Sequence, residues 1–278
     1  MQLNCGGKFL DLSRPIVMGI LNVTPDSFSD GGYFVQLDAA TAQGKRMATE
    51  GAAIIDVGGE STRPKAVTVS VAEELHRVIP VITALATKLA IPISIDTTKP
   101  EVMQAAIKAG ASFINDTNAL RADGAVEMAK FLNVPVCLMH KQGEPSTMQQ
   151  QPQYQNVVVE VQQFLRDRVA VCQAAGIARN HLVIDPGFGF GKTFAHNLTL
   201  FRHLNSFKQL DVPLMVGISR KSMLGAITNK SVEQRLPASL AAAILAIQAG
   251  ANILRVHDVA ETVDAIKIVE TLSLHTLE

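Results

Sequence analysis

Short apolar runs recur along the chain, and each of them ends on a polar or charged residue. Three of these runs follow a Gly-Ala pair, at residues 51–56, 110–115 and 250–255. Glycine suits the left-handed backbone position that commonly ends a helix, and a strand covered on both faces is apolar until it emerges from the sheet. The repeated pattern therefore predicts a helix, a turn and a buried strand in succession.

Eight runs of this kind have the length and apolar character of buried strands. They are residues 16–22, 54–58, 93–96, 113–116, 136–139, 182–185, 214–217 and 253–256. Helix-start signals lie between them. Ser70 and Glu73 have the capping-box spacing, and Pro100 suits the first turn of a helix capped by Thr98 or Lys99. Further helix-start signals lie at Ser231 and Asp258. Residues 156–174 have the apolar spacing of a helix.

Strands that alternate with helices indicate a parallel sheet of the α/β class. A single closed (β/α)8 barrel, the TIM barrel, accounts for both the eight strands and the 278 residues. A doubly wound open sheet is the alternative. We predict that residues 2–12 form a short hairpin at the barrel floor. No linker or low-complexity tract divides the chain, so residues 1–278 are predicted to be one domain.

The residues at the carboxyl ends of the eight strands are all polar, whereas the opposite ends are Gly, Ala and Pro. In TIM barrels the chemistry lies at the carboxyl ends of the strands. This one-sided polarity predicts a catalytic pocket there, formed by Asn22, Asp56, Asp96, Asn115, His140, Asp185, Ser219 with Lys221, and Arg255 with His257.

The stretch from residue 18 to residue 32 is the most informative of these junctions. An apolar run stops at Asn22, and a polar loop follows that holds Pro25, Phe28 and two carboxylates, Asp26 and Asp30. Such a loop after a buried strand suggests a ligand site. An ordinary strand-to-turn junction explains this stretch, taken alone, equally well.

The amino-acid composition limits the kinds of partner that this chain is expected to bind. Hydrophobic residues make up 47% of the chain, while Lys plus Arg and Asp plus Glu number 25 each. This balance argues against a general nucleic-acid or anionic-membrane surface and leaves a small anionic ligand open. Cys5, Cys137 and Cys172 are far apart, with no C-x-x-C spacing, and are interpreted as free thiols. With no signal peptide or membrane span evident, we expect a cytoplasmic protein without a membrane or nucleic-acid partner.

Asp96, Asn115 and Asp185 form an acidic and amide set at the predicted mouth. Buried carboxylates need hydrogen-bond donors, and a guanidine-like heterocycle edge would offer two parallel N–H groups to one of them. The alternative is an internal network satisfied by Lys221 and Arg255.

A basic patch lies beside this set. Residues 219–222, Ser-Arg-Lys-Ser, follow a strand and open a helix, which favours an anion. Arg255 and His257 extend the patch, and residues 61–64 could join them in holding a phosphate. Solvated surface charge is the alternative for any one of these cations.

Two further motifs need care. Residues 185–193 are glycine-rich but lack G-x-G-x-x-G, and Pro186 replaces the first glycine of a P-loop. We interpret them as a βα loop in which Phe188 or Phe190 flanks a ligand. His140 and Cys137 lack a third metal ligand. Asn22 with Asp30 or Asp96 would instead suit a hard cation such as Mg²⁺.

Taken in order, these motifs resemble the dihydropteroate synthase family over nearly the whole chain. The motifs are residues 19–32, 56–64, 93–97, 114–116, 185–192, 219–222 and 255–258. The resemblance implies a TIM-barrel transferase of folate biosynthesis. Such an enzyme condenses 6-hydroxymethyl-7,8-dihydropterin diphosphate with 4-aminobenzoate to give 7,8-dihydropteroate and diphosphate, by a dissociative (SN1-like), Mg²⁺-assisted alkyl transfer.

The resemblance also implies residue roles. The pterin would be bound by Asp96, Asn115, Met139, Asp185, Gly217 and Lys221. The diphosphate would be bound by Asn22, Thr62, Arg63, Arg255 and His257, with Asn22 also the Mg²⁺ ligand. The aminobenzoate would be bound by Phe28, Thr62, Arg63, Pro64, Gly189, Phe190, Ser219, Lys221 and Ser222. The implied catalytic residues are Asp96, Asp185 and Lys221.

The family is usually dimeric and is a sulfonamide target, so a homodimer inhibited by sulfonamides is expected. Three alternatives stay open. They are a methyltetrahydrofolate-binding methyltransferase domain, a Schiff-base aldolase that uses Lys221, and a non-catalytic pterin-binding protein.

Overall fold

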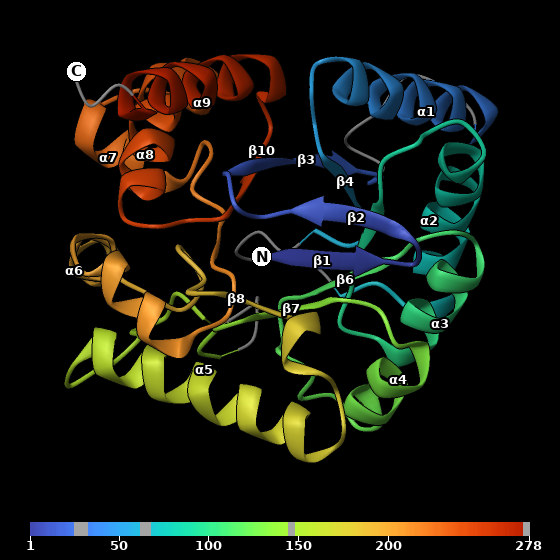
Figure 1. The fold of residues 1–278 in the computed structure, drawn as a ribbon, viewed down its shortest axis with the longest axis horizontal. Helices are drawn as coiled ribbons and strands as arrows, with labels where there is room; N and C mark the ends of the chain where they lie inside the picture. Colours follow the sequence, from blue (N-terminus) through green and yellow to red (C-terminus); the bar gives the residue numbers. More distant parts are fainter. Residues whose placement is uncertain (25–32, 62–67, 144–147, 275–278) are drawn as a thin grey trace.

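The computed structural model describes residues 1–24, 33–61, 68–143 and 148–274. Eight parallel strands form a ring, and helices surround it (Figure 1). The strands follow one another in the order β8-β7-β6-β5-β4-β3-β10-β9. The ring closes between β9 and β8, where Ile184 forms a bridge with Leu214 and its N–H donates to the Pro213 carbonyl over 2.9 Å. The predicted TIM barrel is confirmed.

The barrel strands are β3 (Ile16–Asn22), β4 (Ile54–Gly58), β5 (Ile93–Asp96), β6 (Phe113–Asp116), β7 (Val136–Met139), β8 (Leu182–Asp185), β9 (Met215–Val216) and β10 (Ile253–Val256). Seven of them have the bounds that the apolar runs predict. The prediction of 214–217 was too long, because only Met215 and Val216 pair with β10.

The helices outside the ring are α1 (Tyr33–Thr49), α2 (Val71–Ala86), α3 (Pro100–Lys108), α4 (Ala125–Leu132), α5 (Val157–Ala174), α6 (Phe194–Arg202), α7 (Ser222–Thr228), α8 (Leu236–Gln248) and α9 (Val259–Leu274). Short 3-10 helices lie at η2 (Arg179–His181), η3 (Leu204–Leu210) and η4 (Val232–Gln234). None of the helices in the described part of the chain is long and apolar enough to cross a bilayer.

The predicted helix starts are confirmed, with one correction. The Ser70 side chain accepts the Glu73 N–H at the start of α2, and Asn156 caps α5. At Ser231 only a single 3-10 turn forms, and the long helix α8 begins at Leu236. Pro237 explains the later start, since a proline without an N–H group suits the first turn of a helix.

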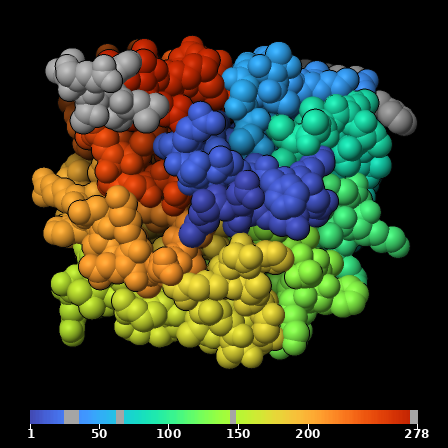
Figure 2. All heavy atoms as spheres, in the orientation of Figure 1, coloured from blue at the N-terminus to red at the C-terminus, as the bar shows by residue number. Residues whose placement is uncertain are grey.

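The predicted hairpin closes the barrel floor. Strands β1 (Gln2–Cys5) and β2 (Lys8–Asp11) pair antiparallel across the end of the ring, where their atoms cover the centre of the face seen in Figures 1 and 2. Lys8 fastens them to the segment before β5, because its ammonium group donates to the carbonyls of Leu89 and Ile91 over 3.1 and 2.9 Å. The buried floor cluster consists of Leu3, Cys5, Leu10 and Leu12 from the N-terminal segment with Met18, Ile54, Phe113, Cys137, Val183, Met215 and Ile253 from the strands.

Candidate active site

Above the apolar floor cluster the barrel interior becomes polar, because on β4, β6, β8 and β10 a polar residue lies two positions after the floor residue. Parallel pairing aligns Asp56 of β4 with Ser94 of β5, and Asp96 of β5 with Asn115 of β6. All four are buried. Because side chains alternate along a strand, these residues point into the ring above the floor cluster. The structure thus brings Asp96 and Asn115 together at the mouth, as predicted.

Arg255 of β10 joins the acids of β4 and β5. Its Nε lies 2.6 Å from Asp56 Oδ2, and its Nη2 lies 2.7 Å from Asp96 Oδ2. Asn115 donates to the same Asp56 oxygen over 2.9 Å. In this respect the internal-network alternative is correct for Arg255. In the described part of the chain Lys221 makes no hydrogen bond or ion pair with a carboxylate, and it interacts with Asp185 and Asp96 only through its charge.

The buried position disturbs the protonation of this network. Desolvation raises the pKa of Asp96 to about 7, although the Arg255 charge opposes the rise. Burial also disfavours the Arg255 cation, yet Asp56 and Asp96 outweigh this effect and hold its pKa above its ordinary value. One guanidinium therefore serves two carboxylates, and the network retains unused capacity for hydrogen-bond donors.

That capacity is visible in three buried atoms. Asp56 Oδ1, Asn115 Oδ1 and Ser94 Oγ have no hydrogen-bond partner among the described residues. Buried polar atoms are normally paired, so unpaired acceptors inside a barrel mouth point to a ligand that donates. The sequence places Asp56 at the predicted mouth but does not assign it a ligand. Its position as the carboxylate shared by Arg255 and Asn115 becomes evident only in three dimensions.

Asp185 and Lys221 lie on the opposite side of the mouth. Asp185 Oδ1 accepts the Gly187 N–H over 2.7 Å, and burial raises the pKa of Asp185. Burial, with the Arg255 charge, lowers the pKa of Lys221 to about 8. The Lys221 ammonium nitrogen stands 4.2 Å from the centre of the Phe190 ring. A cation, a carboxylate and an aromatic face therefore converge here.

Gly217 lies between Asp185 and Arg255. A Cβ atom there would lie 3.8 Å from Asp185 Oδ2 and 4.0 Å from the Arg255 Cβ. Met139 is level with Asp185 in the β7–β8 register and packs with Phe190. The glycine thus leaves room between two charged groups that a planar ligand would need.

Asn22 ends β3 beside Asp96. Both side-chain oxygens, Asn22 Oδ1 and Asp96 Oδ2, lie within 3.8 Å of the position that a Cβ of Gly58 would take. Neutral and anionic oxygens are the ligand type that Mg²⁺ prefers, although Asp96 Oδ2 is also ion-paired with Arg255. The described residues contain no group of three or more His, Cys, Asp or Glu side chains with metal-site geometry.

The basic patch is only partly directed at the mouth. Ser219 Oγ lies 3.1 Å from His257 Nδ1. Burial and the Arg255 charge lower the pKa of His257 to about 4, so its ring is neutral near pH 7. Arg220 is ion-paired with Asp258, so its charge has a partner within the protein. Ser222 begins α7 and is exposed, with Lys221 as the helix cap.

Four predicted site residues, Phe28, Thr62, Arg63 and Pro64, lie outside the described residues, as does Asp30. The remaining predicted site residues fall on the carboxyl ends of the barrel strands or on the loops that follow them.

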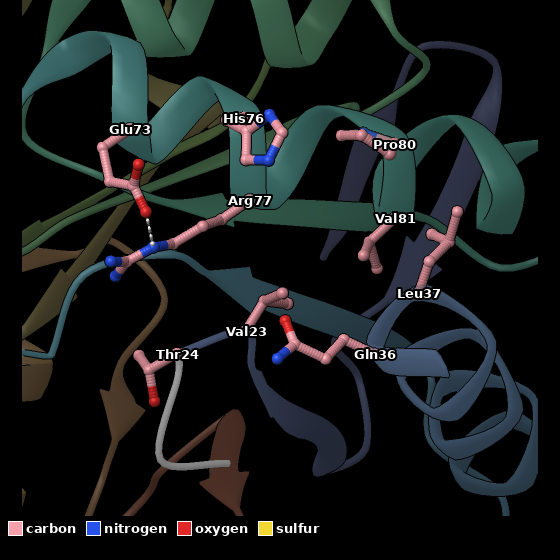
Figure 3. Close-up of a pocket in the computed structure, with 9 residues that line it drawn as sticks. All are labelled: Val23, Thr24, Gln36, Leu37, Glu73, His76, Arg77, Pro80 and Val81. Atoms are coloured by element: carbon pink, nitrogen blue, oxygen red, sulfur yellow. Dashed lines mark hydrogen bonds and ion pairs between the residues drawn. The ribbon is translucent and has the colours of Figure 1, made fainter. Parts of the chain in front are cut away.

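A separate cavity lies on the helix side of the sheet. It measures about 250 Å³ and opens between the end of β3, α1 and α2 (Figure 3). Arg77 crosses it to Glu73 over 2.9 Å and also donates to the Gly59 carbonyl. Its lining residues are Val23, Thr24, Gln36, Leu37, Glu73, His76, Arg77, Pro80 and Val81. None of them belongs to the predicted site.

The family model described as pterin binding enzyme matches residues 18–257. A dihydropteroate synthase of Escherichia coli K12 is 53% identical over 274 residues, covering 98% of this chain and 97% of that protein. The solved structure of Xanthomonas albilineans dihydropteroate synthase with 4-aminobenzoic acid superposes with a TM-score of 0.94 at 51% identity, covering 99% and 98% of the two chains. A Yersinia pestis dihydropteroate synthase in a sulfonamide drug complex gives a TM-score of 0.94 at 50% identity, covering 99% and 100%.

Proposed function

Since this chain belongs to the pterin binding enzyme family and, within it, to the dihydropteroate synthases, we propose how its residues divide the work of that reaction. The enzyme joins 6-hydroxymethyl-7,8-dihydropterin diphosphate to 4-aminobenzoate. The observation that carries the assignment of roles is the ring of buried acids with unpaired acceptors at the barrel mouth, opposite Lys221.

A pterin suits this ring of acids. Its edge presents parallel N–H donors, which one carboxylate accepts in pairs. Asp185 takes this part, because it has one oxygen bonded to Gly187 and lies at the space beside Gly217. Lys221 donates to the pterin carbonyl, while Asp96 and Asn115 bind the remaining ring nitrogens. Met139 packs against the ring plane beside Asp185.

The diphosphate occupies the basic side of the mouth. Arg255, His257 and Asn22 contact it, together with Thr62 and Arg63 of the motif at residues 56–64. The low pKa of His257 makes its neutral N–H a hydrogen-bond donor. Mg²⁺, when bound at Asn22, supplies positive charge that stabilises the departing diphosphate.

The reaction needs no protein nucleophile. The C–O bond to diphosphate breaks and leaves positive charge on the pterin methylene carbon, which the Asp96 carboxylate stabilises. The amine of 4-aminobenzoate forms the new C–N bond and loses a proton.

The aminobenzoate lies against Phe190 and Gly189, with Ser219, Lys221 and Ser222 near its carboxylate. Phe28, Thr62, Arg63 and Pro64 complete that pocket. The aminobenzoate and sulfonamide complexes of the two similar enzymes support this site and sulfonamide inhibition of this enzyme.

We also propose a homodimer in the cytoplasm. Ile227, Val232 and Leu245 expose 56%, 42% and 54% of their surface on α7, η4 and α8, and α7 packs against α8. A second subunit would cover them. Light scattering should give a dimer for the parent and a monomer for Leu245→Asp, and a monomeric parent would contradict the proposal.

The cytoplasmic location is supported by the three buried free thiols, which suit a reducing compartment.

The test of function is release of diphosphate that requires both substrates. Asp185→Asn and Lys221→Ala should abolish most of it, while Asp264→Asn, in an exposed pair with Lys267, should not. Release without aminobenzoate, or none at all in the parent, would refute the assignment. Chelation of Mg²⁺ should slow the parent, and Asn22→Ala should raise the Mg²⁺ concentration needed for half-maximal rate.

A further inference from the structure

Lys192 is the most deeply buried lysine outside the roles assigned above. It is 2% exposed and belongs to none of the ion pairs among the described residues. Its ammonium nitrogen lies 2.8 Å from the Gly187 carbonyl oxygen, 3.1 Å from that of Phe190 and 2.9 Å from His140 Nδ1. Burial lowers the pKa of His140 to about 2, so the ring is neutral. Burial also lowers the pKa of Lys192 to about 7. In the ammonium form, with the His140 proton on Nε2, all three N–H groups of Lys192 are used inside the protein.

These contacts exclude the P-loop interpretation of this segment. A P-loop lysine reaches out to phosphate oxygens, whereas Lys192 points inward at backbone carbonyls of its own loop. The carbonyls need such a donor, because buried carbonyl groups without a partner are costly.

The backbone of the loop from Asp185 to Lys192 is also fixed by contacts other than those of Lys192. Gly187 and Gly191 have φ values of +69° and +61°, and added Cβ atoms would meet the His140 and Gln142 carbonyl oxygens at 1.9 and 2.2 Å. The loop backbone therefore lies directly on the segment after β7. Tyr154 donates to the Gly191 carbonyl over 2.8 Å, and Asn197 accepts the Gly189 N–H over 2.8 Å.

This loop joins the two substrate subsites. The Gly187 N–H bonds Asp185 at one end, and Phe190 faces Lys221 at the other. We propose that Lys192 is a positioning residue. By holding the Gly187 and Phe190 carbonyls together against His140, it sets the distance between the pterin carboxylate and the aromatic wall of the aminobenzoate pocket. The inference rests on the proposed function of both subsites.

The experiment uses Lys192→Met, which keeps length and volume but removes every donor. Both KM values, for the pterin diphosphate and for 4-aminobenzoate, should rise about tenfold or more, because a displacement of about 1 Å at a reacting geometry is expensive. The inhibition constant of a sulfonamide should rise in parallel. Lys192→Gln retains two N–H donors on a shorter side chain. Its KM values and its sulfonamide inhibition constant should lie between those of Lys192→Met and the parent.

Lys8→Met is the matched control. Lys8 also donates to two backbone carbonyls, at the opposite end of the barrel. It should lower the melting temperature and leave both KM values unchanged. If Lys192→Met lowers only the melting temperature, Lys192 is merely structural and the proposal is wrong.

Two safeguards keep the result decisive. If Lys192→Met does not fold, Lys192→Gln carries the same comparison, and unchanged KM values in it overturn the proposal. If the parent releases no diphosphate, the proposed function fails. Calorimetric binding of the pterin diphosphate to parent and variant then still tests the positioning role, and equal affinities overturn it.

Discussion

The two ends of the barrel interior are formed by the same strands, but the floor is apolar and the mouth is polar and charged. Ile54, Phe113, Val183 and Ile253 face the hairpin at the floor, in a cluster without charge. Two residues later on the same strands stand Asp56, Asn115, Asp185 and Arg255. A step of two positions keeps a side chain on the same face of a strand, so each of these four strands carries one floor residue and one mouth residue.

The difference separates stability from function. The floor residues bury apolar surface and stabilise the fold. Asp96 and Asp185 at the mouth are buried carboxylates whose pKa values are raised, which means that their charged forms are held at a cost. We therefore expect substitutions at the floor to lower the free energy of unfolding and leave the kinetics unchanged, and substitutions at the mouth to lower activity without lowering the free energy of unfolding.

The largest effect is expected for Asp185→Asn at the mouth. Loss of the carboxylate removes a charge-assisted pair of hydrogen bonds to the pterin, and the rate of diphosphate release should fall about a thousandfold, or about 4 kcal/mol. The melting temperature should be equal to or above that of the parent, since a buried charge is removed. A loss of activity below tenfold would show that Asp185 is not the pterin carboxylate.

Phe113→Ala tests the floor. Phe113 is fully buried, and its truncation should lower the free energy of unfolding by about 3 kcal/mol. Chemical denaturation measures this loss, and both KM values should stay within a factor of two of the parent. Phe131→Ala, at a site that is 75% exposed, is the control. Kinetic damage equal to that of a mouth variant would remove the distinction between the two ends.

Asp96→Asn sharpens the comparison through pH. The unfolded pKa is near 3.8 and the folded pKa is about 7, raised first by desolvation. A raised carboxyl pKa gives stability that is complete below about pH 4 and lost as pH rises through about 7, and a rise from 3.8 to about 7 corresponds to about 4 kcal/mol. Asn cannot ionise, so the difference in unfolding free energy between pH 5 and pH 8 should shrink. An identical pH dependence in parent and variant would contradict this; Asp264→Asn serves as the exposed control.

The smallest effect is expected for Lys8→Met, which releases the hairpin from the Leu89 and Ile91 carbonyls. The site is part-buried and water can replace the donor, so the loss should be about 1 kcal/mol. Differential scanning calorimetry would show a small fall in melting temperature. A change in KM for either substrate would mean that the floor and mouth are coupled.

Much of the fold was predictable because strand ends are marked in the sequence by a change from apolar to polar. Residues 54–58 and 182–185 have the predicted bounds for this reason. Strand β9 was harder, because Leu214 continues the apolar run but forms only a single bridge to β8. The single 3-10 turn after Ser231 was also missed, since a capping signal does not show how long the following helix will be.

The sequence by itself determined the barrel, its hairpin floor and the set of polar side chains at one rim, because periodicity and strand-end chemistry are local properties of the chain. Only the tertiary structure decided which charges meet. It assigned Arg255 to Asp56 and Asp96, Arg220 to Asp258, and Lys192 to the carbonyls of its own loop. These pairings join residues up to 199 positions apart, and distances of that kind depend on how the ring closes, which no local pattern records.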